Sequence, residues 1–288
     1  MAASTALTAI PGAHAAPAPE GKPIVVLGDS FTANVWDPLP TNECLRGPTA
    51  WPAQLTGRLG ARGAEQVADI SCLGASIDTP PGHTLTHETR AGATAGAFGP
   101  ATKLVTLQFG LNDRWGGSDT SLWDAMRACV FDLAEGCGTE AVAEGRMPDA
   151  QAITGAAFAD RIRNAVTYIR YYAPAARIVL VGYPELFREE QETVCLNFFG
   201  VVPFVQPRGR TIVEYLNRMD LAQREAAREL NVEYFDARAV TTGHGLCSPE
   251  PWVNGVFDPT VKFDGLPFHP SPTGDAVVAN ALYERYVR

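Results

Sequence analysis

Three short runs of apolar residues, at 24–27, 104–107 and 178–181, constrain the fold of this chain more than any other feature. They are rich in β-branched residues and do not alternate between apolar and polar side chains. This pattern is typical of parallel strands that are buried on both faces. Two weaker strand candidates lie at 67–70 and 232–235. We therefore expect five parallel strands in one sheet.

Helical periodicity fills the intervals between the strand candidates. Two sets of apolar residues recur at helical spacing: Phe158, Ile162, Ala165, Ile169 and Tyr172, and more loosely Ile212, Leu216, Met219, Ala226 and Leu230. A last helix is expected after Ser271 as N-cap, with Pro272 in its first turn and with Val277, Ala281 and Leu282 buried. Strands that alternate with helices predict an α/β protein, with helices covering both faces of a central parallel sheet in three layers.

Length and charge exclude several classes of protein. The chain has 288 residues and a formal net charge of −9, with no basic run that could follow a phosphate backbone, so we expect no nucleic-acid partner. No stretch approaches the roughly 18 apolar residues of a membrane span. No linker divides the chain after residue 22, so we expect one domain over 23–288 that acts as a monomer.

The first 22 residues are set apart from this domain. They are rich in alanine, and Ala13-His14-Ala15 before Ala16 fits the small-residue rule of a signal-peptidase site. The apolar stretch before that site is short, is interrupted by Pro11 and follows no basic residue. We interpret 1–22 as an incomplete or mis-started export signal, or otherwise as a disordered tail.

Six cysteines indicate an oxidising compartment. They form no CxxC pair and have no histidine at ligand spacing, so we expect disulfides and no zinc site; they are Cys44, Cys72, Cys129, Cys137, Cys195 and Cys247. Six cysteines allow 15 pairings, among which the spacing does not choose. Three long irregular stretches are also expected, at 76–101, 115–150 and 184–208. Loops of this length are usually functional or held by cross-links.

Polar residues follow the ends of three strand candidates. Ser30 comes directly after the first strand, Gly74 after the second, and Asn112 after the tight turn at Gly110. The carboxyl ends of parallel strands are where α/β folds place their ligands. Taken singly, each of these segments also suits an ordinary polar turn.

Histidine is scarce, with five in the chain. His14 lies in the leader, and His83 and His87 fall where no helix is expected, so we interpret both as surface loop residues. His244 lies between two glycines with no acid or nucleophile nearby in the sequence. His269 is the candidate for chemistry, because it directly precedes the start of the last helix among rigid neighbours.

The ordered set Ser30, Gly74, Asn112 and His269 resembles the four sequence blocks of the SGNH (GDSL-type) hydrolase superfamily. The turn Gly182-Tyr183-Pro184 and the six cysteines are similar to its secreted actinobacterial lipase and esterase branch. The resemblance implies a flavodoxin-like three-layer fold and sequential disulfides: Cys44–Cys72, Cys129–Cys137 and Cys195–Cys247.

The resemblance also implies a serine esterase mechanism without metal or cofactor. Ser30 would attack the ester and His269 would take its proton. The backbone N–H groups of Ser30 and Gly74 and the side-chain amide of Asn112 would bind the oxyanion.

The sequence departs from the family at the acid of the catalytic triad. The family places an aspartate three residues before the histidine, where this chain has Leu266. Either Asp264 still reaches the imidazole, or a backbone carbonyl, most simply that of Leu266, orients it in a Ser–His dyad. Since Pro267 fixes its own φ, we favour the dyad.

The substrate is expected to be a small-molecule or lipid ester with an apolar acyl group, hydrolysed outside the cytoplasm. Trp115 and the apolar run at 197–204 would line an acyl groove or, equally, form a mini-core beneath a loop. The alternatives are an O-deacetylase or acyltransferase on cell-wall carbohydrate, and a cell-surface binding protein that keeps the fold without the chemistry.

Overall fold

A five-stranded parallel sheet forms the centre of the molecule in the computed structural model, which describes residues 19–36, 43–198, 202–256 and 265–288. In spatial order, its strands are β2 (Val67–Asp69), β1 (Ile24–Gly28), β3 (Leu104–Gln108), β4 (Arg177–Val181) and β7 (Glu233–Phe235). All four pairings are parallel. The three strongest apolar runs form the central strands β1, β3 and β4, and the weaker ones form the half-buried edges.

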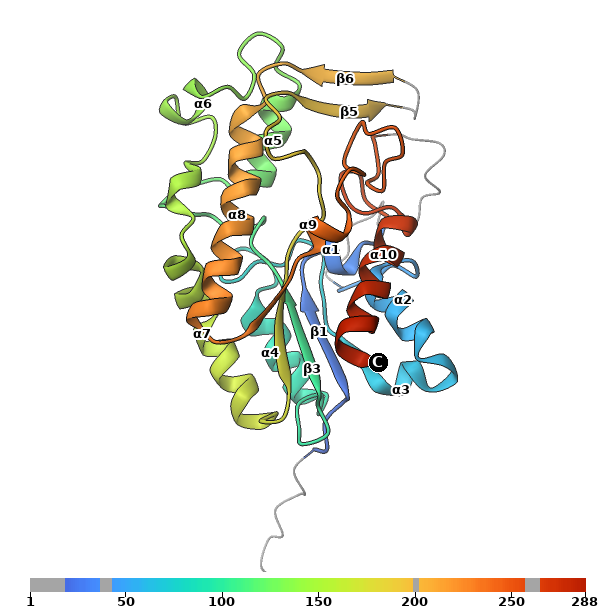
Figure 1. Cartoon of the computed structure of the whole chain (residues 1–288). Helices are drawn as coiled ribbons and strands as arrows, with labels where there is room; N and C mark the ends of the chain where they lie inside the picture. The colour runs from blue at the N-terminus through green and yellow to red at the C-terminus, as the bar shows by residue number, and fades with distance from the viewer. Residues whose placement is uncertain (1–18, 37–42, 199–201, 257–264) are drawn as a thin grey trace, which may run out of the picture.

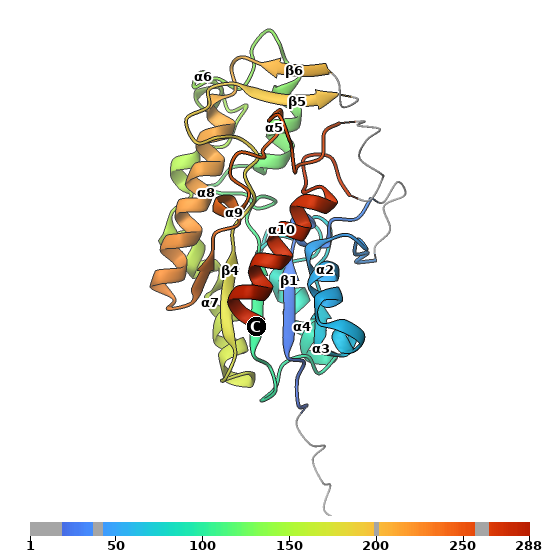
Figure 2. The same ribbon diagram turned by 45° about the vertical axis from the view of Figure 1, so that its right-hand side comes forward.

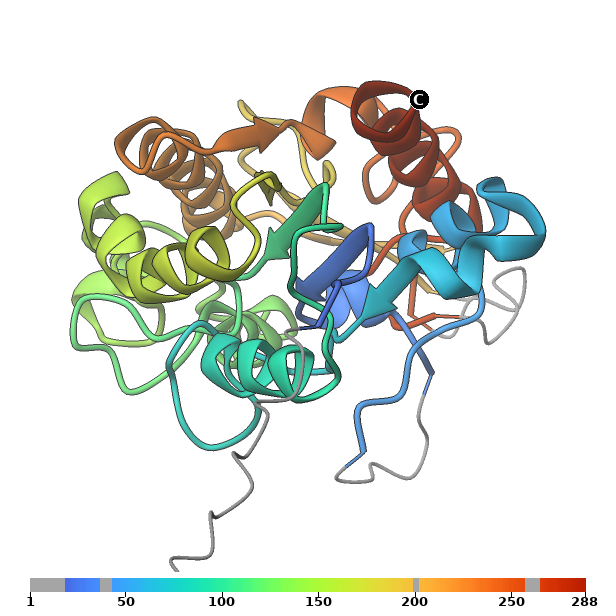
Figure 3. The same cartoon turned by 90° about the horizontal axis from the view of Figure 1, so that it is seen from below.

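Successive residues of the central strands enter two separate hydrophobic cores, because side chains alternate across a sheet. Val25 and Leu27 of β1 point into one core, and Ile24 and Val26 into the other. The first core is covered by α4 (Leu85–Thr94), α7 (Gly155–Tyr172) and α8 (Arg210–Glu229), and the second by α2 (Trp51–Arg58) and α10 (Pro272–Leu282). The view along the strands in Figure 3 shows these helices on opposite sides of the sheet. This confirms the expected three-layer α/β/α fold.

Shorter elements complete the chain. They are α1 (Ser30–Ala33), α3 (Gly63–Gln66), α5 (Leu122–Val130), α6 (Glu140–Ala143), α9 (Ala237–Val240), 3-10 turns at Gly60–Arg62 and Ala150–Ala152, and a π-type turn at Tyr283–Val287. Ser271 caps α10 as expected, since its side chain accepts a hydrogen bond from Gly274 N–H. The buried face of α10 carries Val278, Ala279 and Leu282, which confirms the expected burial of Leu282, whereas Val277 and Ala281 are half-buried.

The expectation that 76–101 lacks a helix was also wrong. Helix α4 begins after Thr84, whose side chain caps His87 N–H while the His87 ring accepts from Thr84 N–H. This reciprocal cap starts a helix that the Gly-, Ala- and Thr-rich composition concealed. The stretch at 115–150 likewise contains α5 and α6. The stretch at 184–208 contains an antiparallel hairpin of β5 (Val194–Phe198) and β6 (Val202–Gln206).

The six cysteines form three disulfides, Cys44–Cys72, Cys129–Cys137 and Cys195–Cys247, which is the pairing that the family resemblance implies. The last of them joins the hairpin to the segment before α10. The hairpin and α5 lie beyond the carboxyl ends of the central strands (Figures 1 and 2). Two of the three irregular stretches, 115–150 and 184–208, therefore contain cross-links.

The beginning of the described chain packs against the loop before β3. Lys22 N–H donates to the Ala97 carbonyl, and Ala101 N–H donates to the Glu20 carbonyl. Residues 1–18, which include most of the expected leader, lie outside the described residues. Over the described ranges, no helix is both long and apolar enough to cross a membrane.

Candidate active site

Ser30 is held at the carboxyl end of β1 by a tight turn into a one-turn helix. Asp29 caps that helix, with its carboxylate accepting a hydrogen bond from Phe31 N–H at 2.9 Å. Asp29 N–H donates to the Gln108 carbonyl at the end of β3, and this fixes the turn between the two strand ends. Ser30 is the first helical residue and is 9% exposed. Its hydroxyl is thus placed where a parallel sheet presents ligand-binding groups.

His269 contacts this hydroxyl directly. Its Nε2 lies 2.8 Å from Ser30 Oγ, although the two residues are 239 positions apart in the sequence. The ring is buried, and burial lowers its pKa from 6.5 to about 4, because charge is disfavoured away from water. At neutral pH the imidazole is therefore uncharged and able to accept the serine proton.

The other ring nitrogen faces a backbone carbonyl. Nδ1 lies 2.8 Å from the carbonyl oxygen of Pro267. The expectation that the Leu266 carbonyl orients the ring was wrong, because that oxygen accepts hydrogen bonds from His269 N–H and Asn254 Nδ2 instead. Phe268 has φ of 65°, and this left-handed residue turns the chain between the carbonyl and the ring. Asp264, the rival, lies outside the described residues.

The histidine loop is tied to the serine helix by Asn34, which sequence reasoning did not single out. Asn34 ends α1, and its side-chain oxygen accepts from Leu266 N–H at 3.1 Å. Its amide nitrogen donates to the Pro270 carbonyl at 2.8 Å and to the Asp275 carboxylate at 2.6 Å. One buried side chain thus holds both ends of the loop that carries His269.

Gly74 lies on the loop after β2, beside the serine turn. Cys72 N–H donates to the Gly28 carbonyl at 2.9 Å, and the Cys44–Cys72 disulfide anchors the same loop. Gly74 has φ of +68° in open space, so its backbone conformation rather than crowding requires glycine. Gly74 is exposed and follows the end of β2, the strand next to β1, as the sequence predicted.

Asn112 lies on the loop after β3, on the other side of the serine turn. Its Nδ2 donates to the Ala75 carbonyl at 3.0 Å, which uses one of the two amide hydrogens. Next to it, buried Asp113 accepts from Ile77 N–H at 2.9 Å and pairs with Arg161. The loops that carry Gly74 and Asn112 are therefore fastened to each other.

Buried acids surround the serine turn. The Asp29 carboxylate accepts a hydrogen bond from the Tyr183 hydroxyl at 2.5 Å, and that hydroxyl accepts from Leu111 N–H. Burial raises the pKa of Asp29 to about 7. Glu88 of α4 accepts from Gly28 N–H at 2.8 Å, and burial holds its pKa well above the usual range. Glu88 lies on the same helical face as Leu85 and was missed because α4 was not expected.

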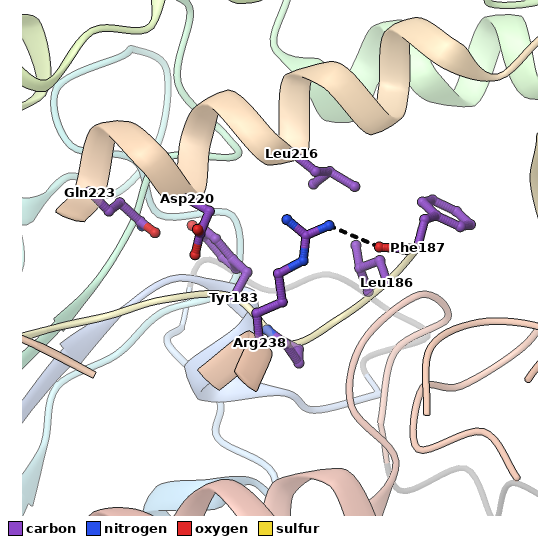
Figure 4. A pocket seen from close by; sticks show the side chains of 8 residues that line it. Tyr183, Leu186, Phe187, Leu216, Asp220, Gln223 and Arg238 are labelled. Carbon is purple, nitrogen blue, oxygen red and sulfur yellow. Dashed lines mark hydrogen bonds between the residues drawn. The ribbon is translucent and has the colours of Figure 1, made fainter. Parts of the chain in front are cut away.

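A small cavity lies behind Tyr183. It has a volume of about 20 Å³ and is lined by Leu216, Gln223 and Arg238 among others (Figure 4). This is room for about one water molecule and too little for an ester substrate.

Aromatic rings enclose His269. Phe31 stacks on the imidazole with ring centroids 4.2 Å apart and an angle of 29° between planes. Trp123 of α5 stands edge-on to it, at 5.2 Å and 79°. Trp123 is half-buried and also contacts Phe268. Sequence reasoning did not single out Trp123, although its ring contacts that of His269.

Trp115 lies elsewhere, so its expected place in an acyl groove was wrong. It is 3% exposed, stacks on Phe158 at 5.6 Å and donates to the Gly110 carbonyl. Trp115 belongs instead to the core beneath the loop, which is the second alternative that the sequence left open for it. In the apolar run, Phe198 and Phe204 pack against Phe131, whereas Val202 is 58% exposed. Residues 199–201 of the run lie outside the described residues, and its described part forms a partly exposed aromatic cluster with an exposed apolar edge.

The remaining described histidines serve local structure. His87 caps α4, and His244 stacks on Trp252 with centroids 3.3 Å apart. Within the described ranges, one group of three possible metal ligands exists, made of Cys44, Cys72 and His83. Both cysteines are in a disulfide and offer no thiolate, the form of cysteine that binds metals.

Comparison with known proteins places this geometry in a family. A model of the "GDSL-like Lipase/Acylhydrolase family" matches residues 26–277, which include the strand ends, Ser30 and His269. The chain belongs to this family. Members of the GDSL family hydrolyse carboxylic esters, and this chain is accordingly a carboxylic ester hydrolase of the actinobacterial lipase and esterase branch.

Similar proteins come from Streptomyces. "Lipase 2" of Streptomyces coelicolor is 28% identical over 281 residues, covering 93% of this chain and 87% of that protein. The crystal structure of phospholipase A1 from Streptomyces albidoflavus NA297 has a TM-score of 0.60 at 23% identity, covering 92% and 99% of the two chains. That of an extracellular lipase from Streptomyces rimosus has a TM-score of 0.59 at 20% identity, covering 91% and 99%. These two structures share the fold of this GDSL hydrolase.

Proposed function

We propose that this protein is a secreted serine esterase or lipase that works through an acyl-Ser30 intermediate with His269 as its general base. The observation that carries the proposal is the 2.8 Å contact between His269 Nε2 and Ser30 Oγ. A serine hydroxyl is a weak nucleophile unless a base lies within hydrogen-bond reach. His269 is such a base, and burial keeps its ring neutral before reaction.

The reaction proceeds by two acyl transfers. Ser30 Oγ attacks the ester carbonyl carbon while its proton moves to His269 Nε2, and the carbonyl oxygen becomes an oxyanion. The N–H groups of Ser30 and Gly74 and the second amide hydrogen of Asn112 donate to that oxyanion. The tetrahedral intermediate expels the alcohol, which takes the proton from His269. Water then repeats the sequence on the acyl-serine, releases the acid and restores Ser30.

The imidazole is oriented by a backbone carbonyl in this proposal. Nδ1–H donates to the Pro267 carbonyl, which fixes the tautomer that leaves Nε2 free to accept. The Asn34 bridge holds that loop against the serine helix, and Asn254 Nδ2 donates to the Leu266 carbonyl within the loop. Ser30 and His269 thus act as a dyad, and no carboxylate of the described residues is bonded to the ring.

Esters with an apolar acyl group suit the site best. The half-buried Trp123 provides an apolar wall next to His269, and the relatives include proteins named lipase and phospholipase A1. We place the enzyme outside the cytoplasm, because its three disulfides persist in oxidising compartments, and because the similar Streptomyces rimosus lipase is described as extracellular.

A fluorophosphonate probe tests the nucleophile. The native enzyme is expected to be labelled on Ser30, and both Ser30→Ala and His269→Ala are expected to abolish labelling and ester hydrolysis. Ser118→Ala, which removes a loop hydroxyl bonded to Thr120, is the matched control and should be labelled like the native enzyme. Absence of labelling in the native protein would instead favour a binding protein that keeps only the fold.

A chain-length profile tests the substrate class. We expect p-nitrophenyl esters of medium or long acyl chains to be hydrolysed with higher kcat/KM than the acetate, since Trp123 offers apolar contact. A preference for acetylated sugars over simple acyl esters would contradict the apolar acyl assignment and support a carbohydrate O-deacetylase.

A further inference from the structure

The catalytic-type histidine packs against two aromatic side chains, while a backbone carbonyl lies at its Nδ1. Phe31 lies over the face of the His269 ring at 4.2 Å, and Trp123 meets it edge-on at 5.2 Å. Both come from elements at the carboxyl end of the sheet, α1 and α5 (Figure 1). Phe31 is 2% exposed, so this contact is closed to water.

The proposed mechanism requires a charge in this apolar place. When His269 takes the serine proton it becomes an imidazolium, and burial opposes that charge. The Pro267 carbonyl supplies a dipole at Nδ1 but no negative charge. A neutral imidazole can accept the serine proton. The transition state, however, needs some group that stabilises the protonated imidazole.

The charged groups on the neighbouring elements are all engaged elsewhere. The Asp29 carboxylate accepts from Tyr183 and from Phe31 N–H. On α5, Asp124 is bonded to Ser121, and Arg127 is exposed. On α10, Asp275 accepts from Asn34. Among the described residues, no carboxylate is hydrogen-bonded to the His269 ring.

We propose that the face of the Phe31 ring stabilises the His269 imidazolium by cation–π contact, and so supplies part of the stabilisation that a carboxylate on the imidazole would give. The face of an aromatic ring carries negative charge density that attracts a cation within about 6 Å. The stacked Phe31 ring, at 4.2 Å, falls inside that distance. Phe31 acts through His269 and is therefore a positioning residue. This inference rests on the proposed Ser30–His269 chemistry.

The measurement that separates this role from plain packing is the pKa of His269 in a covalent adduct. A p-nitrophenyl alkylphosphonate forms a bond from phosphorus to Ser30 Oγ and releases p-nitrophenol, leaving a tetrahedral group beside the imidazole. Titration of the adduct by histidine NMR gives the pKa of His269. The His269 signal is assigned from its absence in isotope-labelled His269→Gln, compared with the unreacted native enzyme.

Mono-, di- and trifluorinated phenylalanine at position 31 is the sharpest series. Fluorination withdraws charge from the ring face with little change of shape, so a packing role alone would leave the pKa of His269 unchanged. We expect that pKa to fall with each fluorine. Phe31→Leu, which keeps the apolar surroundings without a ring, should lower it by about one unit and lower kcat by about tenfold at unchanged KM.

Two comparisons complete the test. The same fluorinated series at Phe98, a buried phenylalanine that packs edge-on against Tyr168, should leave the pKa of His269 and kcat unchanged. Trp123 stands edge-on to the imidazole, so Trp123→Leu should change the pKa of His269 much less than Phe31→Leu does. An unchanged pKa across the Phe31 series, or an equal change in the Phe98 series, would overturn the inference.

Failure of the proposed function would look different. In that case the native enzyme would not react with fluorophosphonates at all. Normal labelling of Ser30 together with an unresponsive pKa of His269 would remove only the aromatic contribution and leave the acyl-serine chemistry intact.

Discussion

The serine turn and the histidine loop are stabilised by different kinds of group. The serine turn is surrounded by buried acids, with Asp29 bonded to Tyr183 and Glu88 bonded to the Gly28 N–H. The histidine loop carries no acid on its imidazole among the described residues, and the ring is held by the Pro267 carbonyl and by aromatic contacts. The serine turn is thus bonded by acidic side chains, whereas the imidazole ring itself is contacted by a backbone carbonyl and by aromatic rings.

Burial has the same consequence on both sides. It raises the pKa of Asp29 to about 7 and lowers the pKa of His269 to about 4, so each group is pushed toward its neutral form. The imidazole that contacts Ser30 is therefore uncharged at rest. Charge separation arises only when the serine proton moves, and the groups aimed at that moment should dominate the rate.

The largest expected loss of activity comes from removing a group that binds the oxyanion. Asn112→Ala removes the amide hydrogen that remains after the bond to the Ala75 carbonyl, and we expect kcat to fall by about 10²–10³-fold at similar KM. Steady-state kinetics on a p-nitrophenyl ester checks this. Asn280→Ala, an exposed asparagine on α10, is the control that should keep native kinetics. A change in KM alone would assign Asn112 to substrate binding.

The pH dependence tests the histidine side. With the pKa of His269 at about 4, kcat/KM should fall tenfold per pH unit below about pH 4 and show no histidine step near 6.5. Between pH 6.5 and about 4, the imidazole of His269 stays neutral in the folded protein but binds a proton in the unfolded protein. The free energy of unfolding should therefore also decline as the pH falls through this range. Because Asp29 titrates near 7, the Asp29→Asn variant separates its contribution. A step above pH 6.5 that survives in Asp29→Asn would indicate a carboxylate on the ring.

Tyr183→Phe tests the acid network around the serine. It removes the hydrogen bond that lowers the pKa of Asp29 and leaves a buried carboxyl oxygen unpaired. We expect a loss of about 1–3 kcal/mol in the free energy of unfolding and about tenfold in kcat/KM. Urea unfolding and ester kinetics measure both. Tyr215→Phe is the matched control, since that buried hydroxyl has no hydrogen-bond partner in the described part of the chain and its removal should cost little.

The smallest expected effect is that of Asp264→Ala. If a backbone carbonyl orients His269, removal of this carboxylate should lower kcat by less than tenfold. A loss on the order of 10⁴, the scale seen when a triad aspartate is neutralised, would establish Asp264 as the third member of a triad. The same variant should leave fluorophosphonate labelling of Ser30 intact.

The sheet and the places of Ser30 and His269 in it could be predicted because their signals are local. The three strongest strands are continuous apolar runs, and Ser30 follows the first of them directly. His269 could be selected because Ser271 and Pro272 mark the helix that follows it. Each of these signals lies within a few residues of the feature that it predicts.

What could not be predicted depends on contacts between distant segments. Trp115 and Trp123 lie in the same stretch of the chain, and only the packing of α5 against the histidine loop decides that Trp123 is beside the site. Asn34 bonds to Leu266 across 232 positions. The choice of the Pro267 carbonyl over that of Leu266 follows from the left-handed backbone of Phe268, a conformation that few phenylalanines adopt.

A crystal structure of the phosphonylated enzyme tests the central claim most directly, because it shows what His269 Nδ1 contacts when the tetrahedral state is occupied. We predict the Pro267 carbonyl oxygen at about 2.8 Å from Nδ1 and no carboxylate within hydrogen-bond distance of the ring. An Asp264 carboxylate bonded to Nδ1 in that structure would contradict the dyad.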